Sequence, residues 1–233
     1  MEEKKVQHPV IAILEKYISE ILVIFIGISI SFFFDEWRDN RKDEETIKKH
    51  LTVLRENLVQ DTLQLAYIIN HGNKLVSSIN KLTYFKSDSE IKDSINFHID
   101  NAASYLVFKP NQMAYEEIRQ TAHTNLIKND SLKTLFLAYY TSTIPNCSEW
   151  CNVDETHTMT QLIPEMSNHF PVVVDSLNLI SSTEKIKALK LKKLRNLLLT
   201  NAVYKKETIH IFILTKRATI RLLKKVNDEL KKS

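Results

Sequence analysis

Residues 21–34 read ILVIFIGISISFFF and contain no charged side chain. As a helix this run covers about 21 Å, which is short of the roughly 30 Å hydrocarbon core of a bilayer. Apolar residues within 9–18 supply the missing length. The sequence therefore predicts one transmembrane helix, roughly from Pro9 to Phe34, followed by a charged collar that ends at Lys42.

One face of this predicted helix carries small and polar side chains. Steps of four and three residues lead from Glu20 to Ile24, Gly27 and Ser31. A charge that faces lipid costs about 2.5 kcal/mol or more, and small residues let helices pack closely. We therefore predict that these four residues line a pore or a helix–helix contact in a homo-oligomer. The alternative is a plain anchor, with Glu20 among the lipid headgroups.

Composition favours an all-α fold. The 233 residues include only two glycines and five prolines, which argues against a turn-rich β architecture. Basic residues near the span are more frequent after it than before it, so the positive-inside rule predicts a cytoplasmic C-terminal part. We divide the chain into 1–42 for the helix and collar, 43–180 for a cytoplasmic helical bundle, and 181–233 for basic helices.

A heptad-like seam follows the collar. Apolar residues recur from Ile47 to Ile68 in alternating steps of four and three, and Asp61 is the single polar break. This period is typical of a coiled coil or of one face of a bundle helix. The pattern leaves open whether the seam packs within one chain or between chains. His71-Gly72-Asn73 predicts the end of this helix, with Gly72 just past its last turn.

Short helices joined by polar loops are predicted after that point. Asn111 and Asn129 are the expected N-caps of helices over 113–121 and 132–140. Val172-Val-Val174 is the one strand-like run, and it is too short to change the all-α prediction.

A motif in the middle of the chain resembles a known family. It reads NQMAYEEIRQT at 111–121 and NLIKN at 125–129, and Tyr139-Tyr140 follow. Together with the collar DEWRDNRK at 35–42, this order of elements resembles an uncharacterised family of bacterial single-span membrane proteins with a cytoplasmic helical domain. The resemblance covers roughly residues 1–145 and implies a bacterial inner-membrane location. The chain departs from the family at Thr121-Ala-His123, where the family often has Ser-Gly.

The segment 184–233 has a strong excess of positive charge. It holds fifteen Lys or Arg and four Asp or Glu, whereas the whole chain has 32 and 28. Such asymmetry points to an anionic partner. The predicted ligand-binding residues are Lys192, Lys193, Arg195, Lys216, Arg217, Arg221 and Lys224.

Lys216 has a special place among these residues, because it falls on the apolar seam predicted for the last helix. A cation on a buried face needs an anion beside it. The candidates are the anionic headgroups of the lipid bilayer, a single-stranded DNA oligomer, and the acidic half of the same protein.

No catalytic constellation is evident, so we do not expect an enzyme. The sequence has no Gly-rich phosphate loop, no Gly-x-Ser-x-Gly elbow and no His-Glu-x-x-His pair. The candidate metal ligands by residue type are Cys147, Cys151, His157 and His169. Their Cys-x-x-x-Cys spacing is not that of a zinc knuckle, and we expect neither a metal nor a cofactor.

Two function classes remain. The first is an oligomeric membrane effector with one helix per subunit, a ligand-sensing cytoplasmic domain and a gated pore. This layout resembles the channel effectors of the Hailong anti-phage system. The resemblance implies a homotetrameric channel that DNA oligomers from a partner nucleotidyltransferase hold inactive, and that depolarises the infected cell when released. The second class is a membrane-tethered helical module with no pore, which docks a protein partner.

Overall fold

The computed structural model describes residues 9–170 and 181–232, with side chains from Tyr17 onward except that of Ser19. Throughout these ranges the regular structure is helical and no strand occurs, which confirms the all-α prediction. The run Val172–Val174 lies outside the described residues. The chain divides into two compact units, Met1–Lys49 and His50–Ser233. Helix α1 (Pro9–Thr83) contributes to both.

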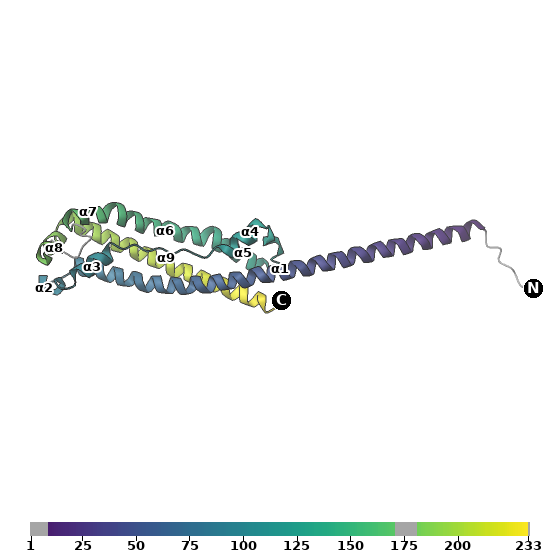
Figure 1. Cartoon of the computed structure of the whole chain (residues 1–233), viewed down its shortest axis with the longest axis horizontal. Coiled ribbons are helices and arrows are strands. Elements are labelled where there is room, and N and C mark those ends of the chain that lie inside the picture. Colours follow the sequence, from purple (N-terminus) through teal and green to yellow (C-terminus); the bar gives the residue numbers. More distant parts are fainter. Residues whose placement is uncertain (1–8, 171–180, 233) are drawn as a thin grey trace, which may run out of the picture. The chain divides into compact units, whose positions relative to one another are not determined.

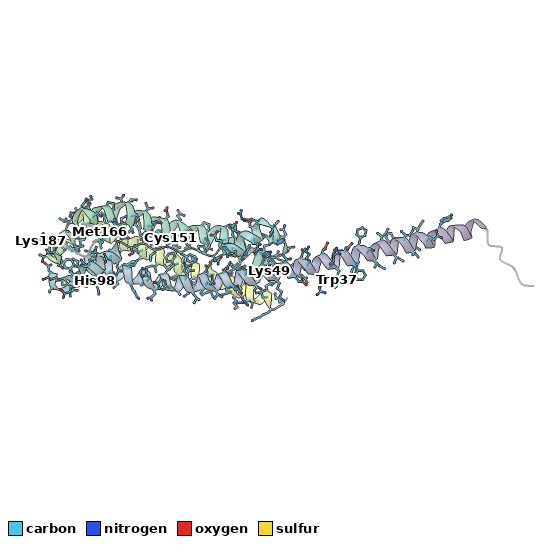
Figure 2. All side chains as sticks on the ribbon, viewed as in Figure 1. Trp37, Lys49, His98, Cys151, Met166 and Lys187 are labelled. Atoms are coloured by element: carbon cyan, nitrogen blue, oxygen red, sulfur yellow. The ribbon has the colours of Figure 1, made fainter. Side chains whose placement is uncertain are left out.

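The described part of the first unit is the N-terminal portion of α1 (Figure 1). Its large apolar side chains are between 50% and 70% exposed on every side of the helix, and Figure 2 shows them standing out from the ribbon. They are Tyr17, Ile18, Ile21, Leu22, Val23, Ile24, Phe25, Ile26, Ile28, Ile30, Phe32, Phe33 and Phe34. Among the described residues, we find no helix with a stretch long and apolar enough to cross a membrane.

The charged collar of this unit is paired within itself. Arg38 lies 3.3 Å from the Asp35 carboxylate, one turn earlier. The guanidinium of Arg41 lies over the ring of Trp37, 5.2 Å from its centroid. Such exposed pairs contribute little to stability, so the collar is mainly a band of charge around the helix.

The second unit is built on three long helical segments. These are the C-terminal portion of α1, α6 (Ile144–His157) and α9 (Lys192–Leu230), which run along one another in Figure 1. One end carries α2 (Asp88–Ile91), α3 (Ile95–Ala102), α7 (Ile163–His169) and α8 (Ser182–Leu189). The other end carries α4 (Met113–Gln120), η1 (His123–Leu126) and α5 (Asp130–Ala138). Two π-helical turns, η2 (Tyr139–Thr143) and η3 (Thr158–Leu162), flank α6.

The predicted seam of α1 faces the interior of this unit. Leu54, Leu58 and Leu65 are fully buried, and Asp61 is buried with them. Ile47, which precedes the second unit, is half-buried. The seam from residue 51 onward therefore packs within one chain, as one face of a bundle helix does.

The predicted helix end at His71-Gly72-Asn73 is wrong, because α1 continues to Thr83. Gly72 lies inside the helix, where a Cβ would approach Ile209 Cγ1 to 2.8 Å and Leu106 Cδ1 to 3.0 Å. Contacts this short are essentially never made by a real Cβ. The glycine therefore allows α9 and the segment before α4 to approach α1, and it does not terminate the helix.

The predicted N-cap at Asn129 is confirmed, whereas α4 has Gln112 as its N-cap, one residue after the predicted Asn111. The side chain of Asn129 accepts a hydrogen bond from Leu132 N at 3.2 Å and starts α5. Asn111 Oδ1 accepts one from Met113 N, also at 3.2 Å, at the start of α4. Both bonds satisfy N–H groups that the first turn of a helix leaves free.

A strained turn follows α4. Ala122 has φ 56° and ψ 16°, in the left-handed region, which costs a residue with a Cβ about 1 kcal/mol or more. The turn brings His123 Nδ1 to 3.0 Å from Nε2 of the buried His50 on α1. The other ring nitrogen of His50 lies 3.5 Å from the Glu117 carboxylate.

Candidate anion-binding pocket

A pocket of about 320 Å³ opens where α5 and η2 meet α9. Arg217 and Arg221, two of the predicted ligand-binding residues, lie one turn apart on α9 and both line it. The other lining residues are Leu135, Ala138, Tyr139, Thr143 and Ala218. The structure therefore brings two predicted cations to one opening.

The local sequence explains why there is room at this point. Ala138 and Ala218 present single methyl groups from the two facing helices. Between α5 and α6 the chain makes the π-helical turn η2, which widens a helix locally and is frequent at functional sites. Tyr139 and Thr143 line the pocket from this turn.

The charge of the pocket is not compensated by ion pairs. Within the described ranges, neither Arg217 nor Arg221 forms a salt bridge, and both side chains are exposed. A guanidinium offers a planar fork of N–H donors that matches phosphate or carboxylate oxygens. The pocket can therefore bind an anion of either class through two forks.

Tyr139 is the most deeply buried lining residue. Its hydroxyl lies 3.0 Å from the Thr219 hydroxyl, and Thr219 in turn donates to the Thr215 carbonyl. Burial raises the pKa of the Tyr139 phenol above its ordinary value, so the phenol stays neutral at physiological pH. It contributes shape and a fixed dipole to the pocket, but no charge.

The remaining predicted ligand residues lie elsewhere. Lys192, Lys193 and Arg195 begin α9, about 40 Å along the helix from the pocket. Lys193 pairs with Glu165, and Arg195 lies over the ring of Tyr84 at the same end. Lys224 is exposed one turn beyond the pocket. The seven residues therefore do not form one site.

The buried cation of α9 is Lys205, which the sequence analysis did not single out. Lys216 is half-buried and Ile220, expected on the seam, is 47% exposed. Thr208, Thr215 and Thr219 occupy buried positions instead, and the hydroxyls of Thr208 and Thr219 bond carbonyls one turn back. Apolar periodicity is right at Ile209 and Phe212, which are buried, but it places the buried face wrongly beyond Phe212, where buried threonines replace apolar residues.

Lys205 forms a buried ion pair with Asp154 of α6. Both side chains are 0% exposed, and Lys205 Nζ lies 2.8 Å from Oδ1 and 3.2 Å from Oδ2. Asp154 Oδ2 also accepts a hydrogen bond from Leu106 N at 2.8 Å. Burial lowers the pKa of Lys205, and Asp154 opposes that shift. The pair joins α6, α9 and the segment before α4, so its role is structural.

Asp61 is a second buried acid, and it has no cationic partner among the described residues. Its Oδ1 accepts a hydrogen bond from Asn111 N at 3.0 Å. Within the described ranges, Asp61 Oδ2, Asn57 Nδ2 and the Tyr140 hydroxyl are buried without a hydrogen-bond partner. Burial raises the pKa of Asp61 to about 6. The polar break in the α1 seam was the sequence signal for this residue.

The four residues considered as metal ligands do not converge. Cys147 and Cys151 are free and buried one turn apart on α6, where Figure 2 marks Cys151. His157 Nε2 lies 3.2 Å from the Leu197 carbonyl oxygen, and His169 lies 3.5 Å from Glu165. In the part of the chain that is described, no group of three or more His, Cys, Asp or Glu residues is arranged to hold a metal ion.

The predicted pore-lining residues lie in the first unit. Ile24, Gly27 and Ser31 share a shallow groove on the helix surface with Ile28, Phe32 and Asp35. The Ser31 hydroxyl donates to the Gly27 carbonyl at 2.9 Å. A Cβ at Gly27 would have no neighbour within 4 Å among the residues that the structure describes. Glu20 is exposed on the same helix.

Comparison with known proteins gives no family assignment: no family model matches the chain, and neither a curated protein nor a solved structure does.

Proposed function

We propose that the chain is a subunit of a membrane-embedded homo-oligomeric channel, and that its helical unit binds an anionic ligand that controls ion conduction. The observation that carries the proposal is the run of exposed apolar side chains on all sides of α1 in the first unit. A helix that is apolar all round is stable in lipid or against other helices. With the apolar residues that precede Tyr17 in the sequence, the stretch 9–34 has the length of a membrane span.

Two residues of this stretch favour several copies over a single anchor. Gly27 costs a helix interior about 1 kcal/mol relative to alanine, and no neighbour in the described chain accounts for it. Glu20 would be costly against lipid tails. A second copy packed on the Gly27 face, with Glu20 turned to a water-filled axis, accounts for both. Four copies are the number that the resemblance to Hailong effectors favours.

The arginine pocket supports ligand control by a phosphate-containing anion. Arg217 and Arg221 are exposed and can each bind a phosphate with two N–H groups. A nucleotide or a single-stranded DNA oligomer carries the required phosphates. We extend the proposal to anti-phage defence at the bacterial inner membrane, with a nucleotidyltransferase as the source of the ligand. This last step rests on the resemblance alone.

Ion flux tests the channel. Full-length protein reconstituted in liposomes is expected to conduct ions, and Gly27→Leu is expected to reduce the flux at least tenfold, because the added side chain separates packed helices. Phe25→Leu, on the opposite face of the helix, is the matched control and should conduct like the wild type. If the wild type does not conduct while its helical unit still binds a partner, the chain is a membrane-tethered module without a pore. If Gly27→Leu conducts like the wild type, the Gly27 face is not the contact between copies.

Oligonucleotide binding tests the pocket. The double variant Arg217→Ala/Arg221→Ala should bind oligothymidylate at least tenfold more weakly than the wild type, with a smaller salt dependence. Lys192→Ala/Lys224→Ala removes the same charge from the same helix outside the pocket, and should retain most of the affinity. Equal losses in the two variants would mean that the positive charge of α9, and not the pocket, determines binding.

A further inference from the structure

Asp61 is a buried carboxylate in an environment that does not compensate its charge. It is 2% exposed, and its one hydrogen bond among the described residues comes from Asn111 N at 3.0 Å. Its second oxygen has no partner there, nor do Asn57 Nδ2 one turn earlier and the Tyr140 hydroxyl. A buried polar atom without a partner is costly, and a charged one more so. This environment favours the neutral acid.

The titratable groups around Asp61 are otherwise uncharged. From η2 come Tyr139 and Tyr140, whose pKa values are raised by burial and also by the Asp61 charge. Tyr115 of α4 stacks on Tyr140, with 4.3 Å between ring centroids, and Cys147 of α6 lies near Tyr139. No lysine, arginine or histidine within the described ranges forms an ion pair with Asp61. Asp61 is thus the group of this cluster that changes charge near neutral pH.

Tyr139 connects this cluster with the arginine pocket. It lies within electrostatic range of Asp61, and it also lines the pocket. Its hydroxyl pairs with Thr219, which lies between Arg217 and Arg221 along α9. Tyr139 is therefore the residue that the pocket and the surroundings of Asp61 have in common.

We propose that protonation of Asp61 regulates anion binding in the arginine pocket. The inference rests on the anion-binding function proposed above. A bound phosphate and a charged Asp61 repel each other, because like charges still interact across the interior of a protein, where the effective dielectric constant is low. Loss of the Asp61 charge therefore strengthens anion binding, and a bound anion favours protonated Asp61 by the same factor.

Fluorescence anisotropy tests this coupling on the full-length chain in detergent. The probe is oligothymidylate with a pH-insensitive dye, since thymine and phosphodiesters do not titrate between pH 5 and pH 7.5. Affinity is measured at both pH values and constant ionic strength for the wild type, Asp61→Asn and Asp100→Asn. Asp100 is an exposed acid on α3 and serves as the matched control. Histidines contribute equally to all three chains, so the difference between variants isolates Asp61.

The wild type and Asp100→Asn are expected to bind roughly fivefold more tightly at pH 5 than at pH 7.5. Asp61→Asn should bind tightly at both, with a residual pH dependence from histidines. Calorimetric titration in two buffers of different ionisation enthalpy should show proton uptake when the wild type binds the probe near pH 6. If Asp61→Asn keeps the full wild-type pH dependence, or if no proton is taken up, Asp61 does not regulate anion binding. The proposed anion binding in the pocket is then unaffected. If the wild type does not bind at either pH, the proposed anion binding fails as well.

Discussion

The two glycines of the chain lie in one helix, α1, in opposite surroundings. A Cβ at Gly72 would approach Ile209 Cγ1 to 2.8 Å, whereas a Cβ at Gly27 would have no neighbour within 4 Å in the described chain. Their neighbours differ in the same way. Leu65 and Leu75 near Gly72 are fully buried, while Phe25 near Gly27 is 67% exposed.

This difference separates residues that the fold explains from residues that it does not. In the second unit, Gly72, the Lys205–Asp154 ion pair and the buried apolar residues have their partners within the same chain. In the first unit, an apolar surface and a helix-weakening glycine have none among the described residues. We therefore propose that lipid or another copy covers the apolar surface of the first unit. Substitutions in the second unit should therefore change the free energy of unfolding, whereas substitutions in the first unit should change assembly or ion flux.

The largest effect on stability is expected at the buried ion pair of the second unit. Lys205→Met should lower the free energy of unfolding by about 3–5 kcal/mol, because Asp154 is left charged and unpaired in the interior. Urea unfolding of the full-length chain in detergent, followed by circular dichroism, measures this change. The double variant Lys205→Met/Asp154→Leu should recover most of the loss. If the single variant is as stable as the wild type, the pair is not buried as the structure has it.

Asp61→Asn should instead raise the free energy of unfolding. Because the folded-state pKa of Asp61, about 6, lies above its value of about 3.9 in an unfolded chain, the charged form destabilises the fold. This contribution vanishes below pH 4, develops between pH 4 and pH 6, and is complete above pH 6. At pH 7.5 the variant should be more stable by about 2–3 kcal/mol. Unfolding measured from pH 4 to pH 7.5 checks this, and an equal pH dependence in both chains would contradict it.

The two glycines give the most direct contrast between the units. Gly72→Ala should lower the free energy of unfolding of the second unit by about 1–3 kcal/mol, because Ile209 and Leu106 must move. Gly27→Ala should leave that value unchanged and alter the mass or the flux of the assembly instead. Urea unfolding and native mass of both variants test the contrast. Equal destabilisation by the two substitutions would show that the units do not differ as described.

The smallest effect is expected at the strained turn. Ala122→Gly relieves a left-handed backbone cost of about 1–2 kcal/mol and loses about 0.5–1 kcal/mol to chain entropy, so a net gain of about 0.5–1 kcal/mol is expected. Ala122→Val should instead be destabilising, because a branched side chain tolerates this conformation poorly. A gain from valine would contradict the left-handed turn.

Periodicity and capping predicted those parts of the fold that depend on local sequence. The seam of α1 and the N-cap at Asn129 are confirmed, whereas the N-cap of α4 is Gln112 and not the predicted Asn111. The end of α1 was predicted wrongly, because a glycine required by a neighbouring helix has the same sequence signature as a C-cap. Such contacts between distant segments cannot be read from one sequence.

The candidate site shows the same limit. Arg217 and Arg221 were predicted from the charge of the last helix, and their spacing of four residues places them on one face. The pocket itself depends on Ala138 and on the π-helical turn at Tyr139, which no periodic pattern indicated. Lys205 was missed because buried threonines shift the interior face of α9 away from its apolar residues. The sequence showed Asp61 as a polar break in the seam of α1. Only the structure showed that it has no cationic partner among the described residues.

We propose that further copies of the chain cover the exposed apolar part of α1 together with lipid. Native mass spectrometry of the full-length chain released from detergent measures this directly. We expect a closed oligomer of defined copy number, which is lost in Gly27→Leu and retained in Phe25→Leu. A wild-type chain that is monomeric under all detergent conditions would contradict it.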